Sequence, residues 1–198
     1  MRRARWVLLR HGESTANRSG IYSGWEDVAL TLLGEQQART AGEQLRGVRF
    51  ERVLCSDLQR ARRTAEIAVA AAGLQGVHIQ THPAFRERHL GDWQGRERAA
   101  VRATHPEQML LAWDRSPPGG EQLGFMVHRL VAGLAALPRA EGPTLFVAHG
   151  GVIRIMLSLL AEEPLSELWK RRVPNAIPIE TTVDPEAWSR VQTRLPAP

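Results

Sequence analysis

The amino-acid sequence predicts an α/β fold with three layers, α/β/α, around a mostly parallel central sheet. Short apolar runs alternate with amphipathic, helix-like stretches along the chain, and this alternation favours parallel strands joined by right-handed crossovers. Two of the runs, residues 6–9 and 144–148, lead within two residues into a histidine followed by a glycine. Ligand sites of open α/β sheets lie at the carboxyl ends of the strands. We therefore expect His11 and His149 to meet at one edge of the sheet.

Length and composition fit one globular domain over residues 1–198, with 43% hydrophobic and 24% charged residues. The formal net charge is +5 and nearly all cations are arginines, with Lys170 as the single lysine. The arginines are scattered, and no stretch interleaves them with several aromatic residues for base stacking. A small anionic substrate is therefore expected in preference to nucleic acid.

Cys55 is the single cysteine, which excludes a disulfide within the chain and argues against a cysteine-rich zinc site. The apolar run 6–9 is too short for a signal peptide, and no stretch approaches the length of a membrane span. We expect a cytoplasmic protein without a membrane partner. The sequence does not determine its oligomeric state.

A polar, glycine-punctuated loop, residues 13–27, follows the first predicted strand. Its hydroxyl and amide groups suit an oxyanion ligand. Thr31 is then expected to cap a helix that Gly47 ends.

The second strand is predicted at 52–55, and the capping-box spacing of Ser56 and Gln59 predicts a helix that starts at Ser56. Arg60 then lies in the first turn, where the helix dipole disfavours a cation and favours an anion. A bound phosphate would explain an arginine there. The alternative is an ordinary solvated arginine, like its two neighbours.

A third strand is predicted at 77–81, and the segment 85–95 that follows carries two candidate acids, Glu87 and Asp92. Glu87 is preferred, because glycines and a tryptophan surround Asp92 and indicate a loop-shaping role. The proline- and glycine-rich residues 116–121 predict a loop that is a candidate lid edge.

Helices are expected at 99–104, 107–113 and 165–172, and a strong apolar stripe from Leu123 to Leu137 predicts a core helix. The strand 144–148 leads through His149 into a further helix. A last strand is expected at 177–183, followed by a frayed tail after Leu195.

Two histidines, two arginines and one carboxylate at strand ends suit few reactions. The His pairs typical of a metal site are missing, as are the G-x-S-x-G elbow of a serine hydrolase and the glycine-rich loops of nucleotide-binding proteins. Phosphoryl transfer through a histidine fits well, since that chemistry depends on positioning and on charge stabilisation by arginine forks.

Taken together and in order, five motifs over about residues 6–155 resemble the histidine phosphatase superfamily, which includes the cofactor-dependent phosphoglycerate mutases. They are Arg10-His11-Gly12-Glu13-Ser14-x-x-Asn17, Gly24-Trp25-x-Asp27-x-x-Leu30-Thr31, Ser56-Asp57-Leu58-x-Arg60-Ala61-x-x-Thr64-Ala65, Glu87, and His149-Gly150-Gly151. As a set these motifs are highly specific.

The resemblance implies that His11 is the nucleophile and forms a phosphohistidine, while Glu87 acts as general acid and then general base. The implied clamp on the phosphoryl oxygens consists of Arg10, Arg60 and His149. The residues expected to contact substrate are Ser14, Asn17, Ser23, Gly24 and Gly150. The resemblance implies no metal and no other cofactor, and the expected partner is a small phosphorylated substrate.

Within this family, segments 91–95 and 118–121 resemble the phosphatase branch, which includes α-ribazole phosphatases and broad-specificity phosphomonoesterases. Mutases carry a longer insertion before the second histidine and usually an Asn in place of Gly151. We therefore expect a phosphatase. The alternatives are a phosphoglycerate mutase and an idle module that binds a phosphorylated ligand.

Overall fold

A computed structural model describes residues 3–105 and 112–198, and in this part of the chain five strands form one sheet in the order β3-β2-β4-β1-β5. The sheet is parallel except for the edge strand β5, which is antiparallel to β1. The strands are β1 (Ala4–Arg10), β2 (Arg52–Ser56), β3 (Ile79–His82), β4 (Thr144–Ala148) and β5 (Ile179–Val183). The predicted mostly parallel sheet is confirmed.

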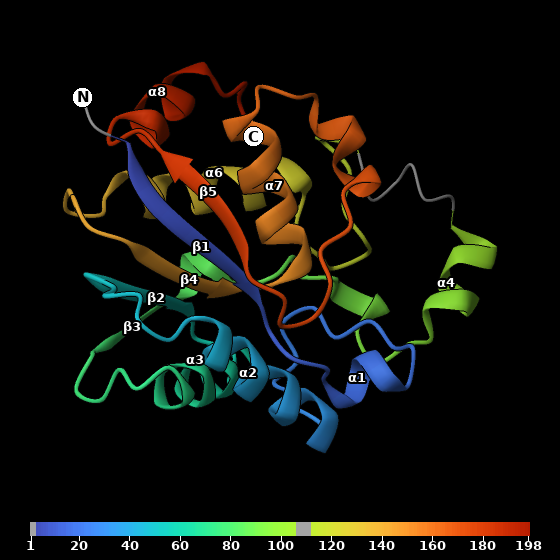
Figure 1. Cartoon of the computed structure of the whole chain (residues 1–198). Coiled ribbons are helices and arrows are strands. Elements are labelled where there is room, and N and C mark those ends of the chain that lie inside the picture. Colours follow the sequence, from blue (N-terminus) through green and yellow to red (C-terminus); the bar gives the residue numbers. More distant parts are fainter. Residues whose placement is uncertain (1–2, 106–111) are drawn as a thin grey trace.

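Helices cover both faces of the sheet and give the three predicted layers (Figure 1). One face carries α2 (Leu32–Gln44) and α3 (Gln59–Ala71), and the other carries α6 (Leu123–Ala135), α7 (Gly150–Leu160) and α8 (Ala187–Arg194). Two short helices, α1 (Thr15–Arg18) and α4 (Arg98–Thr104), lie beyond the end of the sheet where β1 finishes. The 3₁₀ helices are Pro83–Phe85, Gly91–Trp93 and Leu165–Lys170.

Strand β1 is apolar on both faces because it lies inside the sheet between the two helical layers. Val7 and Leu9 belong to the core under α2 and α3, whereas Trp6 and Leu8 belong to the core under α6 and α7. All four side chains are buried. This burial on both sides explains why the strand reads as a continuous apolar run instead of an alternating one.

The register of β1 and β4 positions the polar residues that follow them. Arg10 pairs with Ala148, the last residue of β4, and the amide of His11 donates to the carbonyl of Ala148 at 2.9 Å. His11 and His149 therefore leave the sheet side by side. The predicted meeting of the two histidines at one sheet edge is confirmed.

The helix predicted to start at Ser56 starts at Gln59, so the capping-box prediction is wrong. Leu58 is the N-cap and makes no side-chain capping bond. Ser56 is instead the last residue of β2, and its hydroxyl contacts Nε2 of His149 at 2.8 Å. The Ser56 hydroxyl, which was predicted to cap a helix, therefore contacts a buried histidine instead.

Other boundaries differ by a few residues. Thr31 caps α2 as predicted, but the helix ends at Gln44, before the left-handed Gly47. The third strand begins at Ile79, and the last predicted helix is the 3₁₀ helix Leu165–Lys170. The predicted helix 107–113 lies almost entirely outside the described residues.

The C-terminal tail packs against the body of the protein, so the prediction of a frayed tail is wrong. Helix α8, which was not predicted, precedes it. The Pro196 carbonyl contacts the His128 ring at 2.7 Å, and the Ala197 carbonyl accepts a hydrogen bond from the Trp113 indole at 2.8 Å.

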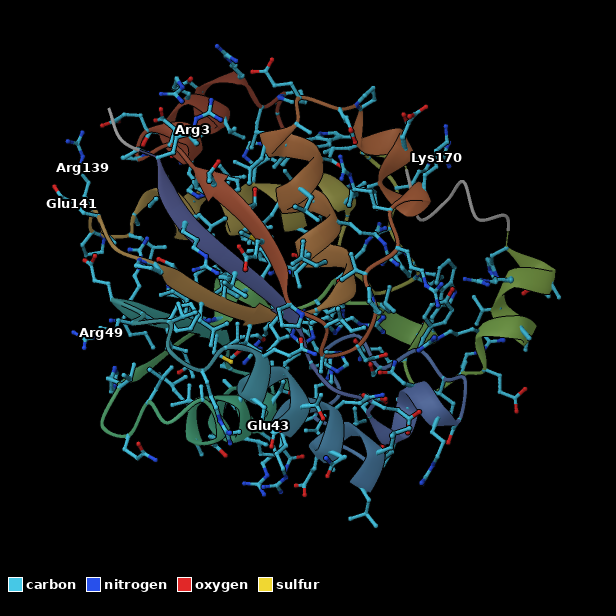
Figure 2. All side chains as sticks on the ribbon, in the orientation of Figure 1. Arg3, Glu43, Arg49, Arg139, Glu141 and Lys170 are labelled. Carbon is cyan, nitrogen blue, oxygen red and sulfur yellow. The ribbon has the colours of Figure 1, made fainter. Side chains whose placement is uncertain are left out.

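Charged side chains such as those of Arg49, Arg139 and Lys170 point outward from different parts of the molecule (Figure 2). All three are exposed. Among the described residues, no helix combines the length and the hydrophobicity needed to cross a membrane.

Candidate active site

His11 is buried at the end of β1 with one ring nitrogen committed. Its Nδ1 lies 2.7 Å from the carbonyl oxygen of Gly12, which can only accept, so Nδ1 carries the proton. Burial lowers the pKa of His11 well below its usual range, and the positive charges of Arg60 and Arg10 lower it further. The imidazole is therefore neutral at pH 7 and holds a lone pair on Nε2. A neutral imidazole in this tautomer is what nucleophilic attack requires.

Gly12 allows the turn that follows His11. A Cβ atom at this position would lie 2.2 Å from the carbonyl oxygen of Gly34 in α2, which is far too close. The amide of Gly12 donates to the hydroxyl of Thr64 in α3 at 3.0 Å. Contacts with α2 and α3 thus fix the backbone of Gly12, whose carbonyl the His11 ring contacts.

His149 packs edge-on against His11, with ring centroids 5.2 Å apart. It is fully buried, and its pKa is also lowered well below the usual range, first by burial and then by Arg60 and His11. Nε2 contacts the Ser56 hydroxyl, while Nδ1 has no hydrogen-bond partner among the described residues. This nitrogen is therefore a buried polar atom without such a partner, and it belongs to the ring that packs against His11.

Arg10 and Arg60 line the cavity in front of His11. The Arg60 side chain is only 1% exposed, so the alternative of a solvated arginine is wrong. It donates to the carbonyls of Glu26 and Gly24, both at 2.8 Å, and Arg10 donates to the carbonyl of Val173 at 2.9 Å.

Both guanidinium groups are held in place but keep unused donors. Burial lowers the pKa of Arg10 and of Arg60 to about 10, so both stay charged at pH 7. The Nε atom of each is buried without a partner among the described residues. Buried polar atoms rarely lack partners in native structures. An oxyanion in the cavity would supply the missing acceptors for the two arginines. Nδ1 of His149 is a third such nitrogen beside His11, but His149 is fully buried and does not line the cavity, so its contact with a phosphoryl oxygen stays a prediction.

Glu87 reaches the same cavity from the loop after the 3₁₀ helix Pro83–Phe85. Its Oε2 accepts from the amide of Gly151 at 2.9 Å, and its Oε1 accepts from the amide of Arg88 at 3.0 Å. Gly151 belongs to the first turn of α7, where backbone N–H groups favour an anion. Asp92 is exposed and does not line the cavity, which agrees with the preference for Glu87.

The loop that carries Glu87 is held by a partly buried ion pair. Arg129 of α6 pairs with Glu121 at 2.6 Å and donates to the carbonyls of Ala84, Arg86 and Glu87, each at 2.9 Å. The indole of Trp25 donates to the same Glu87 carbonyl at 2.6 Å. These bonds fix the backbone on both sides of Glu87. They therefore restrict the positions in the cavity that its carboxylate can occupy.

The loop 116–121, a candidate lid edge, packs instead against the segment after Glu87. The amide of Asp92 donates to the Pro118 carbonyl, and the amide of Glu121 donates to the His89 carbonyl, both at 2.9 Å. Residues 116–121 do not line the cavity. Their observed role is to support the loop of the acid.

Four of the five residues predicted to bind substrate line the cavity, namely Asn17, Ser23, Gly24 and Gly150. Ser14 does not. It is fully buried and forms a capping box with Asn17, in which its hydroxyl accepts from the Asn17 amide at 3.2 Å. The structure therefore corrects Ser14 from a ligand contact to a residue that positions Asn17.

Asn175, which lies between the last 3₁₀ helix and β5, was not predicted to belong to the site, because no local sequence pattern marks it. Its side-chain amide donates to the carbonyl of His11 at 2.8 Å and to Oδ1 of Asn17 at 3.2 Å. Since Oδ1 of Asn17 is occupied in this way, the Asn17 NH₂ group is the part left for a ligand.

Four further arginines line the cavity and were not predicted to belong to the site: Arg88, Arg98, Arg102 and Arg154. Glu87 is the single acidic side chain among the described lining residues. The cavity, of about 450 Å³, is therefore strongly cationic. In the described part of the chain, no group of three or more His, Cys, Asp and Glu side chains could hold a metal ion.

Comparisons with known proteins show the family of this chain. The model of the histidine phosphatase superfamily (branch 1) matches residues 6–194, and the chain belongs to this family. A 2,3-bisphosphoglycerate-dependent phosphoglycerate mutase of Azorhizobium caulinodans is 34% identical, over 87% of this chain and 89% of the mutase. An adenosylcobalamin/α-ribazole phosphatase of Salmonella typhimurium is 36% identical, over 84% of each chain.

Solved structures are similar over nearly the whole chain. A mycobacterial glucosyl-3-phosphoglycerate phosphatase in complex with VO3 has a TM-score of 0.77 and 30% identity, with 89% of this chain and 91% of that chain covered. A putative α-ribazole-5'-P phosphatase of Escherichia coli has a TM-score of 0.79 and 28% identity, with 92% of each chain covered. The family includes both phosphatases and mutases, so it defines an enzymatic class without choosing the reaction.

The lowered pKa values of His11 and His149 predict how stability depends on pH. The unfolded chain, in which both groups return to an ordinary pKa of 6.5, binds protons more readily than the folded protein. The stability contributed by the neutral rings is complete above pH 6.5 and is lost as the pH falls. We expect the free energy of unfolding to fall between pH 6.5 and about pH 5.

Urea unfolding across this pH range measures the effect. The double variant His11→Asn/His149→Asn lacks both rings and should show a shallower slope of unfolding free energy against pH. Parallel slopes for the two proteins would contradict the assignment of buried neutral imidazoles.

Proposed function

We propose that this protein is a phosphomonoesterase that hydrolyses a small phosphorylated metabolite through a phosphohistidine on His11. The observation that carries the proposal is the neutral His11 ring, whose Nε2 makes no hydrogen bond among the described residues. It lies beside nitrogens of Arg10 and Arg60 that have no partner in the same part of the chain. These nitrogens suit the oxygens of a phosphoryl group, and its phosphorus would then lie in front of Nε2.

In the first step, Nε2 of His11 attacks phosphorus and the bond from phosphorus to the ester oxygen breaks. Glu87, in its protonated form, gives its proton to the departing alkoxide, so that an alcohol leaves. Arg10 and Arg60 stabilise the charge on the equatorial oxygens, which is the main demand of a loose phosphoryl-transfer transition state. Nδ1–H of His11 stays on the Gly12 carbonyl, which keeps the ring oriented.

In the second step, water attacks the phosphohistidine while the Glu87 carboxylate takes a proton from it. The phosphorus–nitrogen bond breaks, inorganic phosphate forms, and His11 returns to its neutral state. The acid of the first step is thus restored for the next cycle. Proton transfer of this kind contributes about 10²–10⁴-fold to rate.

A phosphoglycerate mutase is the second candidate, because relatives of that name match this chain at similar identity. In a mutase the phosphohistidine transfers its group to a hydroxyl of the substrate instead of to water. The phosphatase is favoured by the Salmonella relative and by the phosphatase structures with a similar fold.

Phosphorus-31 NMR of the protein with 3-phosphoglycerate and a trace of 2,3-bisphosphoglycerate tests the choice. Formation of 2-phosphoglycerate with little inorganic phosphate would identify a mutase and contradict the proposal. Inorganic phosphate as the growing signal supports a phosphatase. If 3-phosphoglycerate is not consumed, release of phosphate from 4-nitrophenyl phosphate decides between hydrolase and inactive module.

Glu87→Gln should slow hydrolysis most for esters with poor leaving groups. Such esters need the proton that Glu87 supplies, whereas an activated aryl ester departs without it. We expect kcat/KM to fall about 10²-fold or more for an alkyl phosphate and far less for 4-nitrophenyl phosphate. Equal losses on both esters would argue against Glu87 as the acid.

Gly151→Ala should reproduce much of this effect by displacing the Glu87 carboxylate, which contacts the Gly151 amide. A Cβ atom at position 151 would lie 2.3 Å from Oε1 of Glu87, at the mobile end of that side chain. The carboxylate would move away while the backbone stays in place. We expect an alkyl phosphate to lose about 10-fold or more in kcat/KM, with thermal stability nearly unchanged.

The double variant Glu87→Gln/Gly151→Ala is the control for this prediction. If alanine acts by displacing the acid, the second substitution adds little to the first, because the two losses are not additive. Losses that multiply would show that Gly151 acts independently of Glu87.

A further inference from the structure

A short turn before β5, residues 173–176, runs past the end of β1 and contacts it (Figure 1). The Val173 carbonyl accepts a hydrogen bond from Nη1 of Arg10 at 2.9 Å, and the Ala176 amide donates to the Arg10 carbonyl at 3.0 Å. The turn therefore holds both the guanidinium and the backbone of Arg10. Residues 173–176 are not among the described residues that line the cavity, so they can influence a ligand only through other side chains.

Ala176 gives this turn a strained backbone conformation. Its φ angle is 46°, in the left-handed region that residues other than glycine and asparagine rarely adopt. The other non-glycine residue with a positive φ in the described part of the chain is Glu162, which follows the C-cap of α7, where this conformation is ordinary. Strain of this kind persists where surrounding contacts over-determine it, and it concentrates at functional sites.

The turn also leaves the regular register of β5 with β1. Leu8 pairs with Ile179, so the same register would place Ile177 opposite Arg10. The bond to the Arg10 carbonyl comes instead from Ala176, one residue earlier. The residue before Ala176 is Asn175, and its side chain reaches His11 from this turn.

The side chain of Asn175 uses both hydrogens of its amide within the site. Nδ2 donates to the His11 carbonyl at 2.8 Å and to Oδ1 of Asn17 at 3.2 Å. A backbone carbonyl can only accept, so the atom that faces His11 must be the NH₂ group. The same NH₂ group requires an acceptor from Asn17, and this fixes the Asn17 amide with its oxygen toward Asn175.

The orientation of Asn17 has a second support. Its Oδ1 also accepts from the Ser14 amide at 3.3 Å, within the capping box of α1. A flip of the Asn17 amide would therefore lose two hydrogen bonds. Asn17 lines the cavity, and its NH₂ group is the part that remains for an oxyanion.

Asn175 also holds the peptide unit between His11 and Gly12. The carbonyl of this unit accepts from Asn175, and its N–H, which belongs to Gly12, donates to the Thr64 hydroxyl at 3.0 Å. The next carbonyl, that of Gly12, is the acceptor for Nδ1 of the His11 ring. Because the peptide unit is held at both ends, the position of that acceptor is defined, and the ring orientation depends on it.

We propose that Asn175 is a positioning residue, which aligns the His11 ring and the Asn17 amide for phosphoryl transfer without touching the substrate. This inference rests on the proposed phosphatase function. The strained turn at Ala176 keeps Asn175 in place, so one segment from the far end of the chain sets Arg10, His11 and Asn17 together. A misplacement of about 1 Å lowers the rate of a reaction by as much as about 10²-fold, although every reacting group is still present.

Two substitutions of Asn175 test this role. Asn175→Ala removes both hydrogen bonds, and Asn175→Asp keeps the size of the side chain but presents an ionised oxygen, which cannot donate to the His11 carbonyl. We expect kcat for 4-nitrophenyl phosphate at pH 7 to fall about 10-fold or more in both variants, with the loss mainly in kcat and not in KM. A natural kcat in either variant, or a loss confined to KM, would overturn the proposal.

Ile177→Ala is the matched control. It also shortens a side chain beside the turn, but Ile177 is 54% exposed and does not line the cavity. All variants are compared at a temperature at which thermal unfolding curves show them to be folded. The control should keep the natural kcat. An equal loss in Ile177→Ala would show that any change near the turn lowers activity, and would refute the specific role of Asn175.

A double-mutant cycle tests whether Asn175 acts through Asn17. Orthovanadate is the probe, because it imitates a phosphoryl group in transfer and transition-state analogues report on alignment. Asn17→Ala and Asn175→Ala should each raise its inhibition constant about 3-fold or more. The double variant should show less than the product of the two effects, since no Asn17 amide remains to be misaligned. Effects that multiply would contradict the action through Asn17.

Nitrogen-15 NMR of histidine-labelled protein tests the alignment of His11 without any turnover. The ring signals of His11, assigned by their absence from His11→Asn, should show the Nδ1–H tautomer in the natural protein and in Ile177→Ala. In Asn175→Ala they should shift toward exchange between the two tautomers. Ring signals that are identical in Asn175→Ala and in the natural protein would overturn the proposed effect on His11.

These measurements separate failure of this inference from failure of the proposed function. If the natural protein and Asn175→Ala hydrolyse 4-nitrophenyl phosphate equally well, the phosphatase proposal stands and the positioning role is wrong. If the natural protein hydrolyses no phosphate ester, the phosphatase proposal fails, and the ring signals decide whether Asn175 aligns His11.

Discussion

The hydrogen bond from the His11 amide to the Ala148 carbonyl extends the pairing of β1 with β4 by one residue beyond Arg10, the last residue of β1. Because the two strands are parallel and in this register, two histidines that are 138 positions apart in the sequence leave the sheet together. Their rings pack edge-on and are buried, which keeps both neutral. A neutral imidazole at pH 7 with Nε2 facing the cavity side, as the proposed nucleophile requires, follows from this sheet geometry together with burial.

The site around His11 also buries two arginines, Arg10 and Arg60, and this burial is energetically unfavourable. Both cations are removed from water and are only partly compensated by backbone carbonyls, from Val173 for the first and from Gly24 and Glu26 for the second. An uncompensated buried charge is expensive, and an anionic ligand would relieve it. The same charges help to keep His11 unprotonated, so in the proposed reaction one pair of side chains would serve both the ligand and the nucleophile.

The features that were predicted correctly from the sequence are those that depend on neighbouring residues along the chain. Buried strands that end in Arg10-His11 and His149 predict the sheet edge, and an arginine in the first turn of α3 indicates the buried Arg60 that lines the cavity. Ser14 and Ser56 were misjudged because a serine hydroxyl suits a cap, a ligand or a buried histidine equally well. Only tertiary contacts distinguish these roles, and the same holds for Asn175, which reaches His11 from the far end of the chain.

The central claim is that His11 carries the phosphoryl group, and chemical trapping tests it most directly. The protein is mixed with a ³²P-labelled substrate of proven turnover, quenched with alkali within milliseconds, and examined for radioactivity bound to protein. A label that is stable in alkali, labile in acid, absent from His11→Ala and retained in His78→Ala, a variant of an exposed histidine, is the predicted result. Turnover or labelling that persists in His11→Ala would contradict the account.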